Sequence, residues 1–89
     1  RADPAPLRAL TFAAEDLTIE LEVTLDRLHG QLVPPQPGEV EAHQASGQVT
    51  TASIDEDGWF AIRPIPAGSF RLRCHTSSGA SILTGWIAL

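Results

Sequence analysis

Apolar and polar side chains alternate strictly from residue 17 to residue 26. The apolar members are Leu17, Ile19, Leu21, Val23 and Leu25, and each is followed by Thr, Glu or Asp. This period of two predicts a β-strand with one buried face. A helix would align four leucines on one stripe, but it would leave Ile19 and Val23 among acidic residues, so the strand is favoured.

Residues 55–74 predict a turn, a strand, a second turn and a second strand in direct succession. Asp57-Gly58 supplies the positive-φ position of a tight turn, and Pro66-Ala67-Gly68 forms the next boundary. Between and after these turns, apolar residues again occupy every second position. The region therefore predicts two short strands with well-defined ends.

The rest of the chain follows the same pattern of short strands and turns. The other predicted strands cover 7–14, 39–44, 48–54 and 82–89, and residues 39–44 and 48–54 form a hairpin at a sheet edge. Seven or eight short strands without a helix predict an all-β fold, an antiparallel β-sandwich. We predict one domain over 7–89, preceded by an extended lead-in over 1–6.

Charge and composition exclude several functional classes. The chain has 89 residues and a net charge of -5, and residues 1–45 carry three Arg against eight acidic residues. Nucleic-acid binding requires clustered cations, so we predict no nucleic-acid partner. No apolar run reaches the roughly 18 residues of a membrane span, so no membrane association is predicted. The start at Arg1 predicts a fragment of a longer protein.

Residues 30–76 resemble a known family of small β-domains. Its pattern is Gly30-x-Leu32, a Pro-rich loop, Val40-x-Ala42, then Asp57-Gly58-x-Phe60 and Pro66-Ala67-Gly68-x-Phe70. This resembles the carboxypeptidase regulatory-like, or transthyretin-like, β-sandwich domains. The whole chain is also similar to the C-terminal part of small actinobacterial proteins of unknown role. The resemblance implies a domain that contributes packing and contacts, and it transfers no functional residue.

Candidate catalytic and metal-binding groups do not form a recognisable motif. Asp55-x-Asp57-Gly58 lacks the further oxygen ligand of a calcium loop, because Trp59 occupies that position. The three histidines are far apart in sequence, and no serine lies in a nucleophile motif. Cys74 cannot form an internal disulfide and alternates with Phe70 and Leu72, so it should be buried and inert. We therefore predict no catalytic residue, no metal, no cofactor and no enzymatic activity.

Alternation in residues 59–74 predicts an exposed cluster of Trp and Arg. Phe60, Ile62, Phe70, Leu72 and Cys74 should face inward, and Trp59, Ala61, Arg63, Arg71 and Arg73 should face outward. If the two strands pair antiparallel, Trp59 lies near Arg73. Trp and Arg dominate interface energetics, so this face is a candidate interaction site. The alternative is that Glu20 and Glu22 of a neighbouring strand neutralise the arginines.

The C-terminal segment has no charged residue after Arg73. Its apolar residues, Ile82, Leu83, Trp86, Ile87 and Leu89, populate both faces of the predicted strand. Exposed edges normally carry charges that prevent association. This strand is therefore either central and covered on both faces, or it pairs with a missing segment or with another chain, in the latter case as a weak homodimer. Trp86 becomes a candidate interaction residue.

These observations favour a non-enzymatic protein-interaction or structural module. Its partner would be another protein or the remainder of the parent chain, bound through the Trp/Arg face or the C-terminal strand. The alternative is a module that binds carbohydrate or another small ligand, because an exposed Trp can stack on a sugar.

Overall fold

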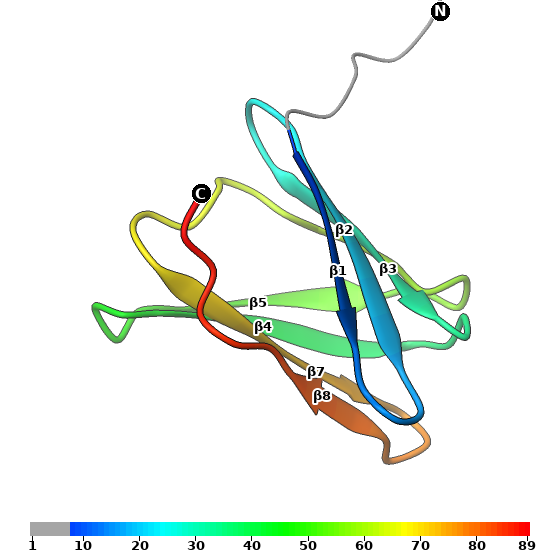
Figure 1. Cartoon of the computed structure of the whole chain (residues 1–89). Helices are drawn as coiled ribbons and strands as arrows, with labels where there is room; N and C mark the ends of the chain where they lie inside the picture. Colours follow the sequence, from blue (N-terminus) through cyan, green and yellow to red (C-terminus); the bar gives the residue numbers. More distant parts are fainter. Residues whose placement is uncertain (1–7) are drawn as a thin grey trace, which may run out of the picture.

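A computed structural model of the chain describes residues 8–89 and shows eight β-strands and no helix among them. The strands are β1 Arg8–Ala13, β2 Thr18–Val23, β3 Leu28–Val33, β4 Gly38–Gln44, β5 Val49–Ile54, β6 Trp59–Ile62, β7 Phe70–Thr76 and β8 Ser81–Leu83. They form two antiparallel sheets of four strands each, which confirms the predicted all-β sandwich architecture (Figure 1). The predicted lead-in over 1–6 lies outside the described residues.

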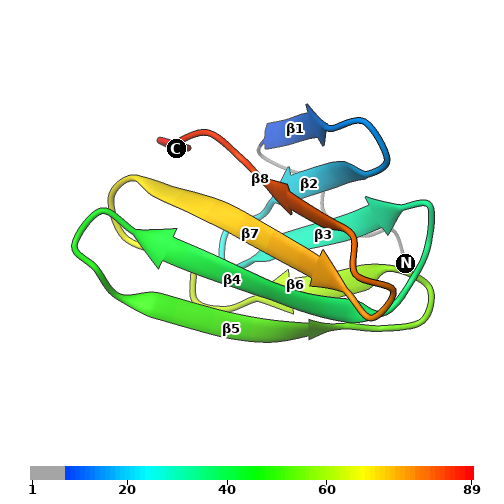
Figure 2. The same cartoon turned by 90° about the horizontal axis from the view of Figure 1, so that it is seen from below.

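The two sheets contain strands from both halves of the chain. The first sheet has the order β1-β2-β3-β6 and the second sheet has the order β5-β4-β7-β8. Figure 2 shows them as two layers, with β8, β7, β4 and β5 in front of the first sheet. The chain passes between the layers at residues 34–37, 55–58 and 63–69. The hairpin of β4 and β5 is as predicted, and β5 lies at a sheet edge.

Inward-facing apolar side chains from both sheets form the core. The five residues predicted to face inward, Phe60, Ile62, Phe70, Leu72 and Cys74, are all buried. Trp59, Ala61, Arg63 and Arg73 are exposed, and Arg71 is half-buried, as the alternation predicted. Leu25 is an exception, because β2 ends at Val23 and a turn closed by the Thr24 N–H to Arg27 carbonyl bond leaves Leu25 87% exposed.

The corner at residues 55–58 joins the second sheet to the first. Gly58 has a φ of 85°, which is the positive value that the sequence predicted. One carboxylate oxygen of Asp55 accepts hydrogen bonds from the backbone N–H groups of Asp57 and Trp59, both at 2.9 Å. The Asp55 side chain is therefore used to hold the turn, in agreement with the turn interpretation of this motif.

The predicted pairing of the two strands after this corner is wrong. β6 pairs with β3 in the first sheet, whereas β7 lies between β4 and β8 in the second sheet. The connection over 63–69 contains Pro64 and Pro66 and is too long for a tight hairpin turn, so it carries the chain from one layer to the other. Trp59 and Arg73 consequently lie on different sheets.

Of the two alternatives for the C-terminal strand, the central position covered on both faces is wrong, and pairing with another chain stays a prediction. β8 covers only Ser81–Leu83 and lies at the edge of the second sheet, and the chain rejoins β7 at the bridge between Phe70 and Ile87. Between these two contacts the C-terminal segment has one residue more than β7, so it bulges at 84–86. Ile82 and Ile87 are buried, while Leu83, Trp86 and Leu89 are each more than half exposed.

The thiol of Cys74 should be unreactive in the folded protein. Its side chain is fully buried and unpaired in a disulfide, and this burial raises the pKa of the thiol to about 12. Because the thiolate is the reactive form, we expect Ellman's reagent to label Cys74 only after denaturant unfolds the chain. Stoichiometric labelling of the native protein within minutes at pH 8 would contradict this placement.

Candidate functional site

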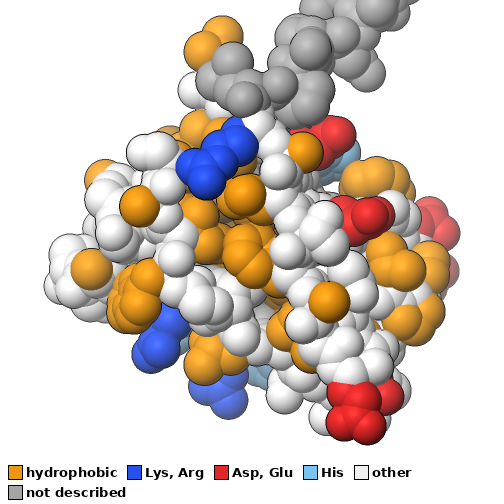
Figure 3. Space-filling model, in the orientation of Figure 1, with side chains coloured by type: hydrophobic (Ala, Val, Ile, Leu, Met, Phe, Trp, Pro, Cys, Tyr) orange, Lys and Arg blue, Asp and Glu red, His pale blue; other side chains and the backbone are white. Residues whose placement is uncertain are grey.

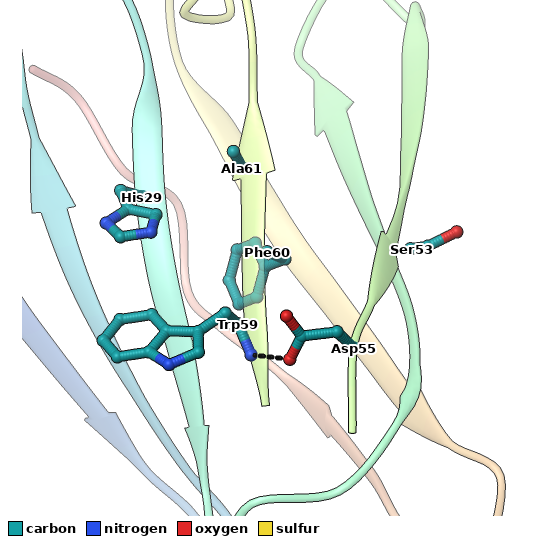
Figure 4. Close-up of a pocket in the computed structure, with 6 residues that line it drawn as sticks. All are labelled: His29, Ser53, Asp55, Trp59, Phe60 and Ala61. Atoms are coloured by element: carbon teal, nitrogen blue, oxygen red, sulfur yellow. Dashed lines mark hydrogen bonds between the residues drawn. The ribbon is translucent and has the colours of Figure 1, made fainter. Parts of the chain in front are cut away.

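Trp59 lies on the outer face of the first sheet, at the edge strand β6. Its indole stacks on the imidazole of His29, with ring centroids 4.9 Å apart and planes 12° from parallel (Figure 4). A shallow hollow of about 340 Å³ adjoins this pair and is lined by His29, Ser53, Asp55, Trp59, Phe60 and Ala61. One candidate residue of the predicted Trp/Arg face thus belongs to a separate surface at the β5 and β6 edges.

Arg63 also lies apart from the other two predicted arginines. It follows β6, and its guanidinium is 3.5 Å from a carboxylate oxygen of Asp26. Both side chains are more than half exposed, so this ion pair contributes little to stability. The pair does, however, neutralise Arg63 locally.

Arg71, Arg73 and Trp86 come together at the outer face of the second sheet. The guanidinium carbon of Arg71 lies 4.9 Å from the centroid of the Trp86 ring, within cation-π distance. Arg71, Arg73, Leu83 and His43 line a hollow of about 100 Å³ beside this contact. We call the four residues Arg71, Arg73, Leu83 and Trp86 the Arg-Trp patch.

The carboxylates that were predicted to neutralise these arginines belong to the other sheet. Glu20 and Glu22 belong to β2 and lie opposite Gln31 and His29 of β3. The carboxylate next to the Arg-Trp patch is Glu41, which lies opposite Arg73 in the pairing of β4 with β7. Within residues 8–89, no carboxylate lies within salt-bridge distance of Arg71 or Arg73, and the buried Nε of Arg71 has no hydrogen-bond partner.

Glu41 is instead bound to a histidine on its own strand. The Nε2 of His43 lies 2.9 Å from Oε1 of Glu41, two residues away on the same face of β4. The pKa of Glu41 lies below its usual value chiefly because of this hydrogen bond. Burial opposes the shift, and the nearby charges of His43, His75 and Arg73 lower the pKa further. The spacing of two along β4 is a signal that the sequence analysis missed.

The lowered pKa of Glu41 predicts a pH effect with a definite sign. A carboxyl group whose pKa is lower in the folded state stabilises the fold above its unfolded pKa, and this contribution disappears as the pH falls through the folded value. We therefore expect the Glu41 carboxyl resonance to titrate below the usual 4.5 in an NMR pH series. In His43→Gln the midpoint should move upward, whereas an unchanged midpoint would assign the shift to another group.

A second cluster adjoins the Arg-Trp patch on the same face. Ligand atoms of Glu39, Glu41 and His75 lie within 4.8 Å of one another, and Nε2 of His75 is 4.0 Å from Oε1 of Glu39 without a hydrogen bond. The side chains of Glu39 and His75 are each about half exposed, and Arg73 lies next to the cluster. Such a group can attract a divalent cation only weakly, and the expected absence of a metal stays a prediction.

Comparisons with known proteins add no assignment. A scan against protein-family models, a search of curated proteins and a search of solved structures each found no match. Over residues 8–89 the structure contains no helix that could cross a membrane. The functional interpretation therefore depends on the geometry of the surfaces described above.

Proposed function

We propose that this chain is a non-enzymatic interaction module that binds an acidic segment of a partner protein through the Arg-Trp patch. The observation that carries the proposal is the stacking of Arg71 on Trp86 beside Arg73, where no carboxylate of the described residues pairs with either guanidinium. The partner would be another protein or a different part of the parent chain.

The composition of the patch suits such a ligand. Trp86 is 56% exposed and Leu83 is 55% exposed, so both can bury apolar area on binding. The guanidinium groups can bind a carboxylate in bidentate fashion, and the Nε of Arg71 still has a donor to offer. Figure 3 shows arginine side chains beside hydrophobic side chains on the lower part of the molecule, where the second sheet reaches the surface.

A matched pair of charge reversals tests this proposal. We expect a fluorescent acidic peptide that contains phenylalanine to bind in low salt and to be released as the ionic strength rises. Arg71→Glu should weaken binding about tenfold or more, whereas Arg63→Glu on the other sheet should leave it unchanged. Equal losses in the two variants would indicate a general charge effect and reject the patch.

A second candidate function is the binding of a small ligand such as a carbohydrate. The hollow beside Trp59 supports it, because an indole face for stacking lies close to the polar groups of Ser53 and Asp55. In a Trp86→Phe background, Trp59 is the remaining indole, so glycan titrations report on it directly. A flat fluorescence response across a broad glycan panel would reject this alternative.

We further propose that the sandwich is of the transthyretin-like, carboxypeptidase regulatory-like type. The two Asp-Gly-x-Phe and Pro-Ala-Gly-x-Phe motifs support this, since both phenylalanines are buried and both glycines have positive φ. Such domains are joined to many unrelated proteins, so this assignment alone indicates no activity. An experimental structure with a different strand order would overturn it.

A further inference from the structure

The outer edge of β5 presents a row of unpaired backbone groups. The Gln44 N–H bonds to the Gln48 carbonyl at the turn between β4 and β5. Hydrogen-bonded pairs recur every second residue along an antiparallel ladder, so residues 50, 52 and 54 of β5 point their backbone groups toward β4. The N–H and carbonyl groups of Val49, Thr51 and Ser53 therefore point away from the sheet. Among residues 8–89, no strand pairs with this side of β5. At the end of β5 the Asp55 N–H bonds to the Trp59 carbonyl of β6, and the hollow beside Trp59 borders Ser53.

β5 also lacks the features that usually protect a sheet edge. Residues 48–54 contain no charge, no proline and no glycine, and they include the consecutive β-branched residues Val49, Thr50 and Thr51. Val49 is 48% exposed. A six-residue edge strand of this kind is a template for another strand.

The other edges of the described sandwich are better protected. β8 has three residues and is followed by the bulge at 84–86. β6 has four residues, its Trp59 backbone is already bonded to Asp55, and Arg63-Pro64 follows it. β1 begins with Arg8, whose guanidinium donates to the Ala88 carbonyl and so holds a charge beside that edge.

We propose that two copies of this chain associate by antiparallel pairing of their β5 edges, with Thr51 opposite Thr51 across a two-fold axis. In this register Val49 of each copy lies opposite Ser53 of the other. Every free backbone donor and acceptor of Val49, Thr51 and Ser53 then has a partner. The two second sheets become one continuous sheet with an isologous interface.

Charge selects this register over its neighbours. The acidic corner Asp55–Asp57 directly follows β5. With Thr51 at the centre, the acidic corner of one copy lies beside the uncharged turn 45–47 of the other, so the two acidic corners are at opposite ends. A shift that centres the pairing on Ser53 would bring the two corners closer and would leave Val49 without a partner, which like-charge repulsion and lost hydrogen bonds both oppose.

The association leaves the Arg-Trp patch accessible and duplicates it. β7 is separated from β5 by β4, and the two-fold axis is perpendicular to the shared sheet, so both patches lie on one face. A dimer would therefore present two patches to one partner and gain avidity without new contacts. The dimer itself does not depend on the function proposed for the patch.

Sedimentation velocity across a concentration series tests the proposal with matched proline variants. We expect the chain to shift from its monomer mass to twice that mass as its concentration rises. Thr51→Pro removes a donor that faces away from β4, so the fold tolerates it, while the dimer dissociation constant should rise at least about tenfold. Thr11→Pro on the edge strand β1 is the control, and its dimer affinity should match that of the unchanged chain.

Hydrogen exchange of the unchanged chain provides a second measurement in case the proline variants are destabilised. The amides of Val49, Thr51 and Ser53 should exchange more slowly as the concentration rises, and those of Ala9, Thr11 and Ala13 should not. A chain that stays monomeric at millimolar concentration would overturn the proposal. So would concentration-dependent protection of β1, or a dimer that survives Thr51→Pro and is lost in Trp86→Glu, which would place the interface at the C-terminal segment.

Discussion

Gly58→Ala should cost about 3 kcal/mol or more of the free energy of unfolding, a large part of the stability of a domain of this size. Gly58 has a φ of 85°, which an L-residue adopts only at a cost of about 1–2 kcal/mol. A Cβ added there would also clash with the Leu32 carbonyl oxygen. That oxygen belongs to the backbone of β3, so no rotation of a side chain can relieve the clash.

Gly47→Ala is the control that separates the cost of a positive φ from the cost of a steric clash. Gly47 has a φ of 98°, and a Cβ added to it would meet no atom within 4 Å. This variant should therefore lose only the conformational cost of about 1–2 kcal/mol. Urea unfolding followed by circular dichroism measures both variants, and equal losses would show that the close approach to Leu32 has no energetic effect.

Local geometry explains what the sequence could predict of this fold. The alternation from Leu17 to Val23 and the inward position of Phe60 and Phe70 follow from the two-residue repeat of a strand, which needs no knowledge of other strands. The positive φ of Gly58 follows from the requirements of one tight turn. Such features involve residues that are close in sequence, so the local sequence pattern is enough to predict them.

The pairing of strands could not be predicted in the same way. The expectation that β6 pairs with β7 assumed that neighbouring strands form a hairpin, but the connection over 63–69 joins two different layers. Nothing in a period of two states which sheet a strand enters. The prediction that Trp59 and Arg73 both face outward was therefore correct, but the prediction that they share one surface was wrong.

The candidate site shows the same division between local and long-range information. The contact of Glu41 with His43 could have been predicted, because residues two apart on a strand share a face. The stacking of Arg71 on Trp86 could not, because it depends on the bulge at 84–86 and on the return of the chain at Ile87. A flat continuation of β8 would have changed which side chain faces Arg71.

Phe70→Ala should remove a large part of the stability of the domain. Phe70 is fully buried, and it is the largest of the fully buried side chains in the described residues. Truncation of a buried phenylalanine to alanine costs about 3–5 kcal/mol, since the transfer free energy is lost and a cavity remains. Domains of this kind are stable by about 5–15 kcal/mol, so the variant should be partly unfolded at room temperature or melt well below the unchanged protein.

The same substitution should affect the Arg-Trp patch before the fold is lost. The backbone of Phe70 exchanges two hydrogen bonds with Ile87, the N–H donating at 3.0 Å and the carbonyl accepting at 2.6 Å, and Trp86 directly precedes Ile87. A cavity under this bridge should loosen the C-terminal segment. The fluorescence of Trp86, followed in a Trp59→Phe background, should therefore change at a lower urea concentration than the circular dichroism signal.

Leu83→Ala is the control, because its side chain is 55% exposed and its removal should change stability by less than about 0.5 kcal/mol. Coincident transitions in Phe70→Ala would mean that the C-terminal segment unfolds only with the whole sandwich, and that the patch is as stable as the core beneath it.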